Sequence, residues 1–266
     1  MVEHEDEAGV LAALARRADP DRFLCALFAP APMRGLLFLL AAFDHELARA
    51  RAAVSEPGLA LIRLHWWREV VQGARRRHEV AWPLGNALDA GRLDPAILLE
   101  MIDAREAEAE DAPFATIAEW RDYLFATAGG ANLAAGRALG AAAGHELALR
   151  TLGARFGAGR LLRTARGFAQ AGRCLLPLDA LAAHGLDPHM LRARPDAPGL
   201  DAALKALAAE ARAWPLDPAG LPRAATLPLV LARMDLRQPT RPPAPRGLGA
   251  RLAVSWAGLA GVRRGG

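Results

Sequence analysis

The sequence predicts an all-α protein, for three reasons. Hydrophobic residues make up 53% of the chain and many are alanines, whereas aromatic residues account for 6% and runs of β-branched residues are scarce. Apolar residues recur at helical spacing in several segments, and strand-like alternation never exceeds four residues. Neither a repeat period nor a long linker divides the 266 residues, so we expect a single domain over residues 1–266 with a substantial core.

Aspartates and prolines mark where the helices of the first half begin. Asp19 or Asp21 can cap the second helix and Asp94 a later one, because their side chains accept from free backbone N–H groups. Pro30 and Pro32 break the chain before a long central helix. The expected helices span residues 7–17, 22–27, 33–54, 59–73, 80–89 and 96–111.

The helix over residues 59–73 is expected to be the most strongly amphipathic in the chain. Its apolar positions recur at helical spacing and predict one buried face: Leu59, Ile62, Trp66 and Val70. We interpret Trp66 as a core residue. The alternative is that Trp66, Trp67 and Trp82 meet a membrane interface or a partner.

The second half is also helical, with proline-rich loops between the helices. A long helix over residues 118–139 ends in a stretch of small residues, which lets helix axes approach closely. Further helices are expected at residues 147–162, 201–214, 224–236 and 248–262, with a loop at 187–200. Residues 238–246 form a Pro-rich linker to the terminal helix.

Composition narrows the classes of function. The formal charge is +4 and Lys205 is the only lysine, so the cations are almost all arginines, which bind carboxylate and phosphate in a bidentate manner. No nucleic-acid-binding motif accompanies them, and we expect no nucleic-acid partner. Cys25 and Cys174 have neither metal-site nor disulfide spacing.

The sequence also carries no signal for export or membrane insertion. The acidic first residues lack the pattern of a signal peptide. The longest apolar run, from Leu36 to Phe43, has eight residues and is too short to span a bilayer. We therefore expect a cytoplasmic protein, either soluble or peripheral at the inner face of the inner membrane.

The end of the central helix, residues 42–56, has the composition of a cavity wall. The apolar run that ends at Phe43 passes directly into a polar turn that contains Asp44, His45, Glu46, Arg49 and Arg51. A polar turn on an otherwise apolar helix is typical of a wall that faces an internal cavity.

The segment from Arg163 to Pro177, with the residues after it, resembles the second signature of the squalene/phytoene synthase family. The matching positions are Gly172, Arg173, Leu176, Pro177, Asp179, Leu181 and Gly185. Tyr123, Ala128 and Gly129 resemble the family's tyrosine-containing helix of small residues. The resemblance spans residues 21–185 and implies an isoprenoid-synthase-like helical bundle around a central cavity.

The chemistry of that family requires two acidic clusters that bind Mg²⁺ and hold the diphosphates of two isoprenoid substrates. In this chain the corresponding positions are not acidic: Ala48, Arg49 and Ala52 in the first cluster, and Thr164, Gly167 and Phe168 in the second, with Arg160 in place of an Asn. Hard cations need oxygen ligands. The departures therefore imply no catalytic residues, no metal and no cofactor, with Mg²⁺ required only if the protein is an enzyme.

A second resemblance accommodates these departures. The motifs that carry it are Phe43, Glu46-Leu47-Ala48, Val54-Ser55-Glu56, Trp67, Asp103-x-Arg105-Glu106 and Asp111. They resemble the branch of the same superfamily that includes a mitochondrial complex I assembly factor. The resemblance implies a role in the biogenesis of NADH dehydrogenase, with a complex I subunit or assembly intermediate as the partner.

Two sets of residues are candidates for a binding site. Five arginines could line the cavity and bind an anion without metal, although ordinary surface arginines are an equally good interpretation: Arg49, Arg160, Arg163, Arg166 and Arg173. The acids Asp103, Glu106 and Glu110 could form a substitute metal site. We favour instead a solvated acidic face that pairs with Arg105.

Three functions remain open. We favour a non-catalytic, scaffold-like protein in complex I assembly, which could touch the membrane. The second is a divergent head-to-head transferase of farnesyl or geranylgeranyl diphosphate, with Asp103, Glu106 and Glu110 as its only plausible metal ligands. The third is a carrier of an isoprenoid diphosphate or phospholipid that uses the cavity and the arginines.

Overall fold

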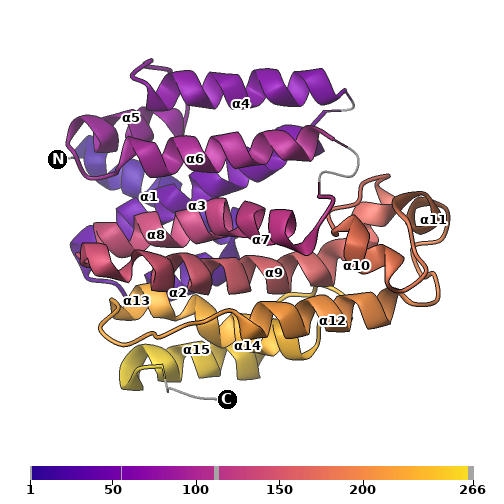
Figure 1. The fold of residues 1–266 in the computed structure, drawn as a ribbon. Coiled ribbons are helices and arrows are strands. Elements are labelled where there is room, and N and C mark those ends of the chain that lie inside the picture. The colour runs from indigo at the N-terminus through magenta and orange to yellow at the C-terminus, as the bar shows by residue number, and fades with distance from the viewer. Residues whose placement is uncertain (1, 55, 111–113, 263–266) are drawn as a thin grey trace.

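The computed structural model confirms the all-α prediction. It describes residues 2–54, 56–110 and 114–262, and no strand occurs within them. The helices run side by side in a stack, with α4 and α15 at opposite outer edges (Figure 1). Ser55 and Asp111, which carried part of the sequence resemblance, lie outside the described residues.

The helices of the first half begin where the caps predict. The Asp19 side chain accepts from the backbone N–H of Arg22 at 3.0 Å, and Asp94 accepts from that of Ala96 at 2.9 Å. The helices are α1 (Val2–Ala18), α2 (Pro20–Ala26), α3 (Ala31–Ala52), α4 (Pro57–Val71), α5 (Ala81–Asp89) and α6 (Pro95–Glu106).

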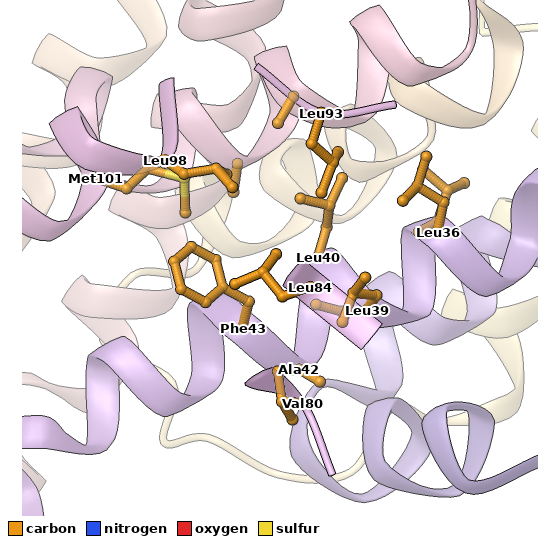
Figure 2. Close-up of a cluster of buried hydrophobic side chains, with 14 of the residues drawn as sticks. Leu36, Leu39, Leu40, Ala42, Phe43, Val80, Leu84, Leu93, Leu98 and Met101 are labelled. Atoms are coloured by element: carbon orange, nitrogen blue, oxygen red, sulfur yellow. The ribbon is translucent and has the colours of Figure 1, made fainter. Parts of the chain in front are cut away.

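The core of this half forms where α3 meets α5 and α6. Leu40 and Phe43 of α3 point toward Leu84 of α5 and toward Leu98 and Met101 of α6 (Figure 2). Phe43, Leu84, Leu98 and Met101 are fully buried. The apolar run of α3 is thus fixed in the protein interior, and this fixes the position of the polar turn that follows it.

The predicted buried face of α4 is wrong at two positions. Ile62 is 65% exposed and Leu59 is 44% exposed, whereas Leu64 and Trp67 are buried. Trp67 packs edge-on against Phe43, with ring centroids 5.5 Å apart. Because α4 is apolar on more than one side, its spacing could not select the face, and packing against α3 selects it.

The long helix expected at residues 118–139 is interrupted. It forms α7 (Ile117–Ala126) and α8 (Ala128–Ala138), separated by Thr127, whose ψ of −86° is not helical. The Thr127 hydroxyl donates to the Tyr123 carbonyl at 2.7 Å. Gly129 and Gly130 come just after Ala128. Because glycine has a low helix propensity, breaking the helix here costs little free energy.

The next helix is longer than predicted. α9 (Glu146–Gln170) continues eight residues beyond the expected end at residue 162, because no proline stops it. It ends before Gly172, whose φ of +75° is a conformation that favours glycine. α9 contacts α7, α8, α12 and α14 and is therefore central to the second half.

The remaining elements are two short turns and the helices that follow α9 in the chain. The expected loop at residues 187–200 contains a short helix, and the expected helix at 224–236 is divided before Pro228. The elements are the 3₁₀ turns η1 (Ala107–Ala109) and η2 (Ala143–His145), α10 (Leu178–Ala182), α11 (Pro188–Ala193), α12 (Leu200–Ala213), α13 (Arg223–Thr226), α14 (Pro228–Arg237) and α15 (Leu248–Ala260).

Candidate functional site

A partly open cavity of about 250 Å³ lies between α2, α3, α7, α9 and the α6–η1 segment. Its apolar lining includes Leu124, Phe156, Leu161, Phe168 and Leu175. The polar end of α3 contributes Asp44 and His45, which confirms that this turn faces a cavity. Charged side chains from several other helices line the opposite wall.

One part of the charged wall joins α2, α3, α6 and α9. Arg160 donates to Asp19, and Asp19 also lies 3.9 Å from the Arg22 guanidinium. Arg22 in turn donates to Asp44. The other oxygen of Asp44 accepts from Arg105 at 3.0 Å. Each of these two carboxylates is therefore shared between two arginines.

The other part of the wall is centred on Glu108. Its Oε1 accepts from Arg105 at 2.5 Å and from the Tyr123 hydroxyl at 2.6 Å, and its Oε2 accepts from Arg173 at 2.9 Å. Burial raises the pKa of Tyr123 well above its ordinary value, so the phenol keeps the proton that it donates. Arg105 joins this part to Asp44 and makes the ion-pair network continuous.

The network keeps its carboxylates ionised. Burial alone would raise the pKa of Asp44, but the charges of Arg22 and Arg105 outweigh that effect and lower it to about 2. The same opposition between burial and neighbouring arginines lowers the pKa of Asp19 and of Glu108. All three acids are thus carboxylates at neutral pH.

The charge of the network is positive by one. It contains four arginines, namely Arg22, Arg105, Arg160 and Arg173, and three carboxylates, those of Asp19, Asp44 and Glu108. The buried Nε atoms of Arg105 and Arg173 have no hydrogen-bond partner in the part of the chain that the structure describes.

A wider vestibule of about 760 Å³ adjoins the cavity. The two share Ala52, Thr164, Phe168 and Arg173. Among the described residues, the charged side chains that line the vestibule are all arginines: Arg51, Arg163, Arg166 and Arg173. Arg163 already donates to Asp235, Arg166 to Asp196 and Asp201, and Arg173 to Glu108. Among the described residues Arg51 has no carboxylate partner, and it is therefore the vestibule arginine best suited to an anionic ligand.

The five arginines that the sequence offered as anion-binding candidates do not all line the same space. Arg160 and Arg173 line the cavity, and Arg163 and Arg166 line the vestibule with Arg173. Arg49 is not among the residues that line either space; its side chain is 52% exposed and donates to Glu46 at 3.1 Å. Anion binding by the other four remains a prediction.

Four of the positions that the sequence resemblance aligned with the family's acids line the cavity: Ala48, Ala52, Thr164 and Phe168. Gly167 lines the vestibule, and Arg49 faces outward. The alignment with the family signatures placed these residues on two walls of one cavity, and their positions in the structure are consistent with that.

The candidate substitute metal ligands lie away from the cavity. Asp103 and Glu106 both hold Arg68, and their side chains are 57% and 46% exposed. Glu110 is also exposed. The sequence paired this acidic face with Arg105, which is wrong, because Arg105 is buried in the cavity wall and its place on the surface is taken by Arg68.

Sequence reasoning missed most of the network. Asp19 was interpreted only as a helix cap, Arg22 only as a helical residue, and Glu108 was not singled out. The available signal was Asp44, which directly follows the apolar run, because a charge at that position must be buried and paired. The partners of Asp44 could not be read from spacing, since they come from α2 and α6.

The donor set of the cavity does not fit Mg²⁺. The three cavity carboxylates already accept from arginines, and within the described residues no group of three or more His, Cys, Asp or Glu side chains is placed to hold a metal ion. Mg²⁺ is usually bound by one or two carboxylates together with water and substrate phosphates, and each cavity carboxylate would have to give up an arginine partner to serve as such a ligand. The positive charge next to these carboxylates is supplied by arginine side chains instead of a bound metal ion.

One further property bears on location. Across residues 2–54, 56–110 and 114–262, no helix has both the length and the apolar composition needed to cross a bilayer.

Comparison with known proteins gives both a family and a group of relatives. A family model for squalene/phytoene synthase matches residues 15–237. NADH dehydrogenase (ubiquinone) complex I assembly factor 6 of Homo sapiens is 32% identical over 114 residues, and that of Mus musculus is 31% identical over 120 residues. These matches cover 41% and 44% of this chain but 34% and 36% of the relatives, so the chain matches about a third of their length.

Solved structures share the fold over almost the whole chain. A dehydrosqualene synthase crystallised with a ligand has a TM-score of 0.76 and 15% identity, with 97% of each chain covered. A squalene synthase from Alicyclobacillus acidocaldarius has a TM-score of 0.66 and 16% identity, with 98% of this chain and 96% of that chain covered. These matches confirm the predicted isoprenoid-synthase-like bundle around a central cavity.

Proposed function

This chain belongs to the squalene/phytoene synthase family, and on that premise we propose that it is a non-catalytic member that acts in the assembly of respiratory complex I. The observation that carries the proposal is the arginine–carboxylate network of the cavity. Each cavity carboxylate is already held by arginine, and Ala48, Ala52, Thr164 and Phe168 line the walls where the family's activity requires acids.

The reaction of such enzymes needs a cation to bind the departing diphosphate. Magnesium at Asp44 would compete with Arg22 and Arg105, and magnesium at Glu108 would compete with Arg105 and Arg173, so either position would bring a second cation against buried guanidinium groups. The cavity has thus kept a shape suited to an apolar guest while its charges are satisfied internally. A protein built in this way is suited to binding rather than to turnover.

The assembly role comes from the relatives. Their name describes complex I assembly factor 6, and the similarity extends over about a third of their length. We extend that role to this chain as part of the proposal, together with a complex I subunit or assembly intermediate as partner and a location at the inner face of the inner membrane.

A deletion strain tests the assembly role. Membranes from the strain should lose NADH:quinone oxidoreductase activity, while succinate dehydrogenase activity, the control, stays at the parental level. A plasmid copy of the gene should restore the lost activity. Squalene and phytoene pools should not change. Normal NADH:quinone oxidoreductase activity in the deletion strain would rule out the assembly role.

A turnover assay tests the absence of catalysis separately. Purified protein with farnesyl or geranylgeranyl diphosphate and Mg²⁺ should release no diphosphate, whereas a dehydrosqualene synthase assayed in parallel should. Diphosphate release with a head-to-head product would overturn the non-catalytic assignment and support the divergent transferase instead.

The vestibule supports a second candidate function, the binding of an anionic lipid. Its described charged lining is entirely arginine, and it adjoins the cavity, whose lining includes apolar side chains such as Leu124, Phe156 and Leu161. Arg51 donates to the Val54 carbonyl at 2.9 Å and has no carboxylate partner among the described residues. A phosphate group could accept from it without metal.

Thermal unfolding with and without ligand tests this candidate. Farnesyl diphosphate or phosphatidic acid, added with a chelator, should raise the unfolding temperature by mass action. Arg51→Gln should abolish the rise. Arg49→Gln, two residues along the same helix but outside both spaces, should leave it intact. No rise at any ligand concentration, or equal loss in both variants, would exclude the vestibule as a lipid site.

A further inference from the structure

The terminal helix α15 carries an exposed apolar stripe that the cavity and its network do not involve. The stripe consists of Leu248, Leu252, Trp256 and Leu259, which are between 59% and 74% exposed. Their spacing of four, four and three residues places them within about 80° of arc on one side of the helix. α15 lies at the outer edge of the helical stack (Figure 1).

The opposite side of α15 is firmly anchored. Val254 is fully buried, and Gly258 lies so close to Phe28 that an added Cβ would come within 2.3 Å of its ring. Arg223 donates to the carbonyls of Gly258 and Leu259 at 3.2 and 3.0 Å. The exposure of the stripe is therefore a fixed feature of the packed helix.

The charge that α15 itself carries is positive. In the segment that leads into it, Arg237 and Arg241 are exposed, whereas Arg246 is paired with Asp21 and Asp235. Arg251 lies within α15 and is exposed. An apolar helix face with leucine and tryptophan, and with an exposed arginine beside it, is complementary to a surface that combines hydrocarbon with negative charge.

The small size of the stripe favours a lipid bilayer over a protein partner. A stable protein–protein interface uses about 20–30 residues on each side, whereas the stripe presents four large side chains on a single helix. A bilayer requires no shape-matched partner surface, and tryptophan is favoured at its interface with water. We infer that α15 docks the protein peripherally onto an anionic lipid bilayer through Leu248, Leu252, Trp256 and Leu259.

Docking at α15 would bring the vestibule close to the lipid. Pro242 and Pro243, which lie in the segment that leads into α15, form part of the vestibule wall, and Arg163 holds that segment through the carbonyls of Arg241 and Pro242. The lipid contact does not depend on the proposed assembly role, because it follows from α15 alone.

Vesicle flotation of the full-length protein tests the inference. The protein should float with vesicles of phosphatidylcholine and phosphatidylglycerol and float much less with phosphatidylcholine alone. Added salt should weaken the binding, because it screens the arginines. Leu252→Ser/Trp256→Ser should reduce partitioning about tenfold or more, since both side chains lose their apolar contact with lipid.

The matched control is Leu59→Ser/Ile62→Ser, which removes two exposed apolar side chains from α4 on the opposite edge of the stack. This variant should float like the wild type. Failure of the wild type to float, or equal loss in both variants, would overturn the inference. So would a lipid-free dimer, measured by light scattering, that Leu252→Ser/Trp256→Ser converts to a monomer, because the stripe would then be a protein interface.

Discussion

At the scale of residues, Glu108 accepts hydrogen bonds from the side chains of Arg105, Tyr123 and Arg173, which come from three separate segments. Its side chain is 5% exposed, so its partners are shielded from water as well. Removing such a carboxylate costs more than the bonds themselves, because it leaves buried guanidinium groups without a counter-charge.

We therefore expect Glu108→Gln to lower the free energy of unfolding by about 3–5 kcal/mol, the range typical of a broken buried ion pair. Asp103→Asn is the matched control, because Asp103 also pairs with an arginine but is 57% exposed. Its effect should be within about 1 kcal/mol. Urea denaturation followed by circular dichroism measures both. Equal costs would mean that the cavity network contributes no more than a surface pair.

The lowered pKa of Asp44 predicts a loss of stability in acid. The folded protein holds the pKa at about 2, below its ordinary value of 3.8. The unfolded chain therefore takes up a proton more readily. The stabilisation is complete above pH 4 and is lost as the pH falls toward 2. It amounts to about 2 kcal/mol for this one group.

Asp44→Asn isolates this contribution. At neutral pH the variant should be less stable than the wild type, and its stability should fall less steeply between pH 4 and pH 2. Denaturant midpoints measured at intervals across that range test the expectation. If the two proteins lose stability in parallel, proton uptake at Asp44 is not part of the acid response.

At the scale of elements, small residues set the distance between α8 and α9. A Cβ added to Gly153 would lie 2.3 Å from the Ala128 carbonyl oxygen and 2.8 Å from the Gly129 Cα. Both atoms belong to backbone, which cannot move aside as a flexible side chain can. The close approach of the two helices brings Arg160, further along α9, to the wall of the cavity.

We expect Gly153→Ala to destabilise the protein by about 1–3 kcal/mol, the usual cost of overpacking, despite the better helix propensity of alanine. Gly167→Ala on the same helix has no atom within 4 Å of the added Cβ. That variant should gain up to about 1 kcal/mol. Opposite shifts in the unfolding temperature are the expected result. A stabilised Gly153→Ala would show that the two helices can separate without loss.

The elements also show where sequence periodicity fails. Helices with an aspartate cap or a proline break, such as α2, α3 and α6, begin within two residues of their predicted start. The buried face of α4 was predicted wrongly at two positions, and the interruption at Thr127 was not predicted. Packing against α3 selects the face of α4, and a local hydrogen bond accompanies the break at Thr127; apolar spacing within one segment carries no information about either.

At the scale of the whole molecule, the resemblance predicted the fold and the cavity, and four of the six positions that it aligned with the family's acids line that cavity. The resemblance could not predict which arginine pairs with which carboxylate. Asp19 and Arg160 are 141 residues apart in the chain and Glu108 and Arg173 are 65 apart. Only the assembled helices determine which arginine meets which carboxylate, so the network was not predictable from motifs.

The internal pairing leads to a final expectation, that the folded protein is indifferent to Mg²⁺. A ligand stabilises a protein only if it binds the folded state more tightly than the unfolded one. The cavity carboxylates are engaged by arginine, so Mg²⁺ finds no open set of oxygen ligands there. The unfolding temperature in Mg²⁺ and in a chelator should therefore agree within about 1 °C, below the shift of about 2–4 °C that 1 kcal/mol produces in a protein near this size.

Ala48→Asp/Ala52→Asp provides the positive control for that measurement, because both positions line the cavity one turn apart on α3. The variant places two unpaired carboxylates on one wall, and Mg²⁺ should raise its unfolding temperature. If Mg²⁺ instead stabilises the wild type to the same degree, a metal site exists that the arginines do not block. The non-catalytic assignment would then lose its physical basis, since the cavity could bind the cation that diphosphate departure requires.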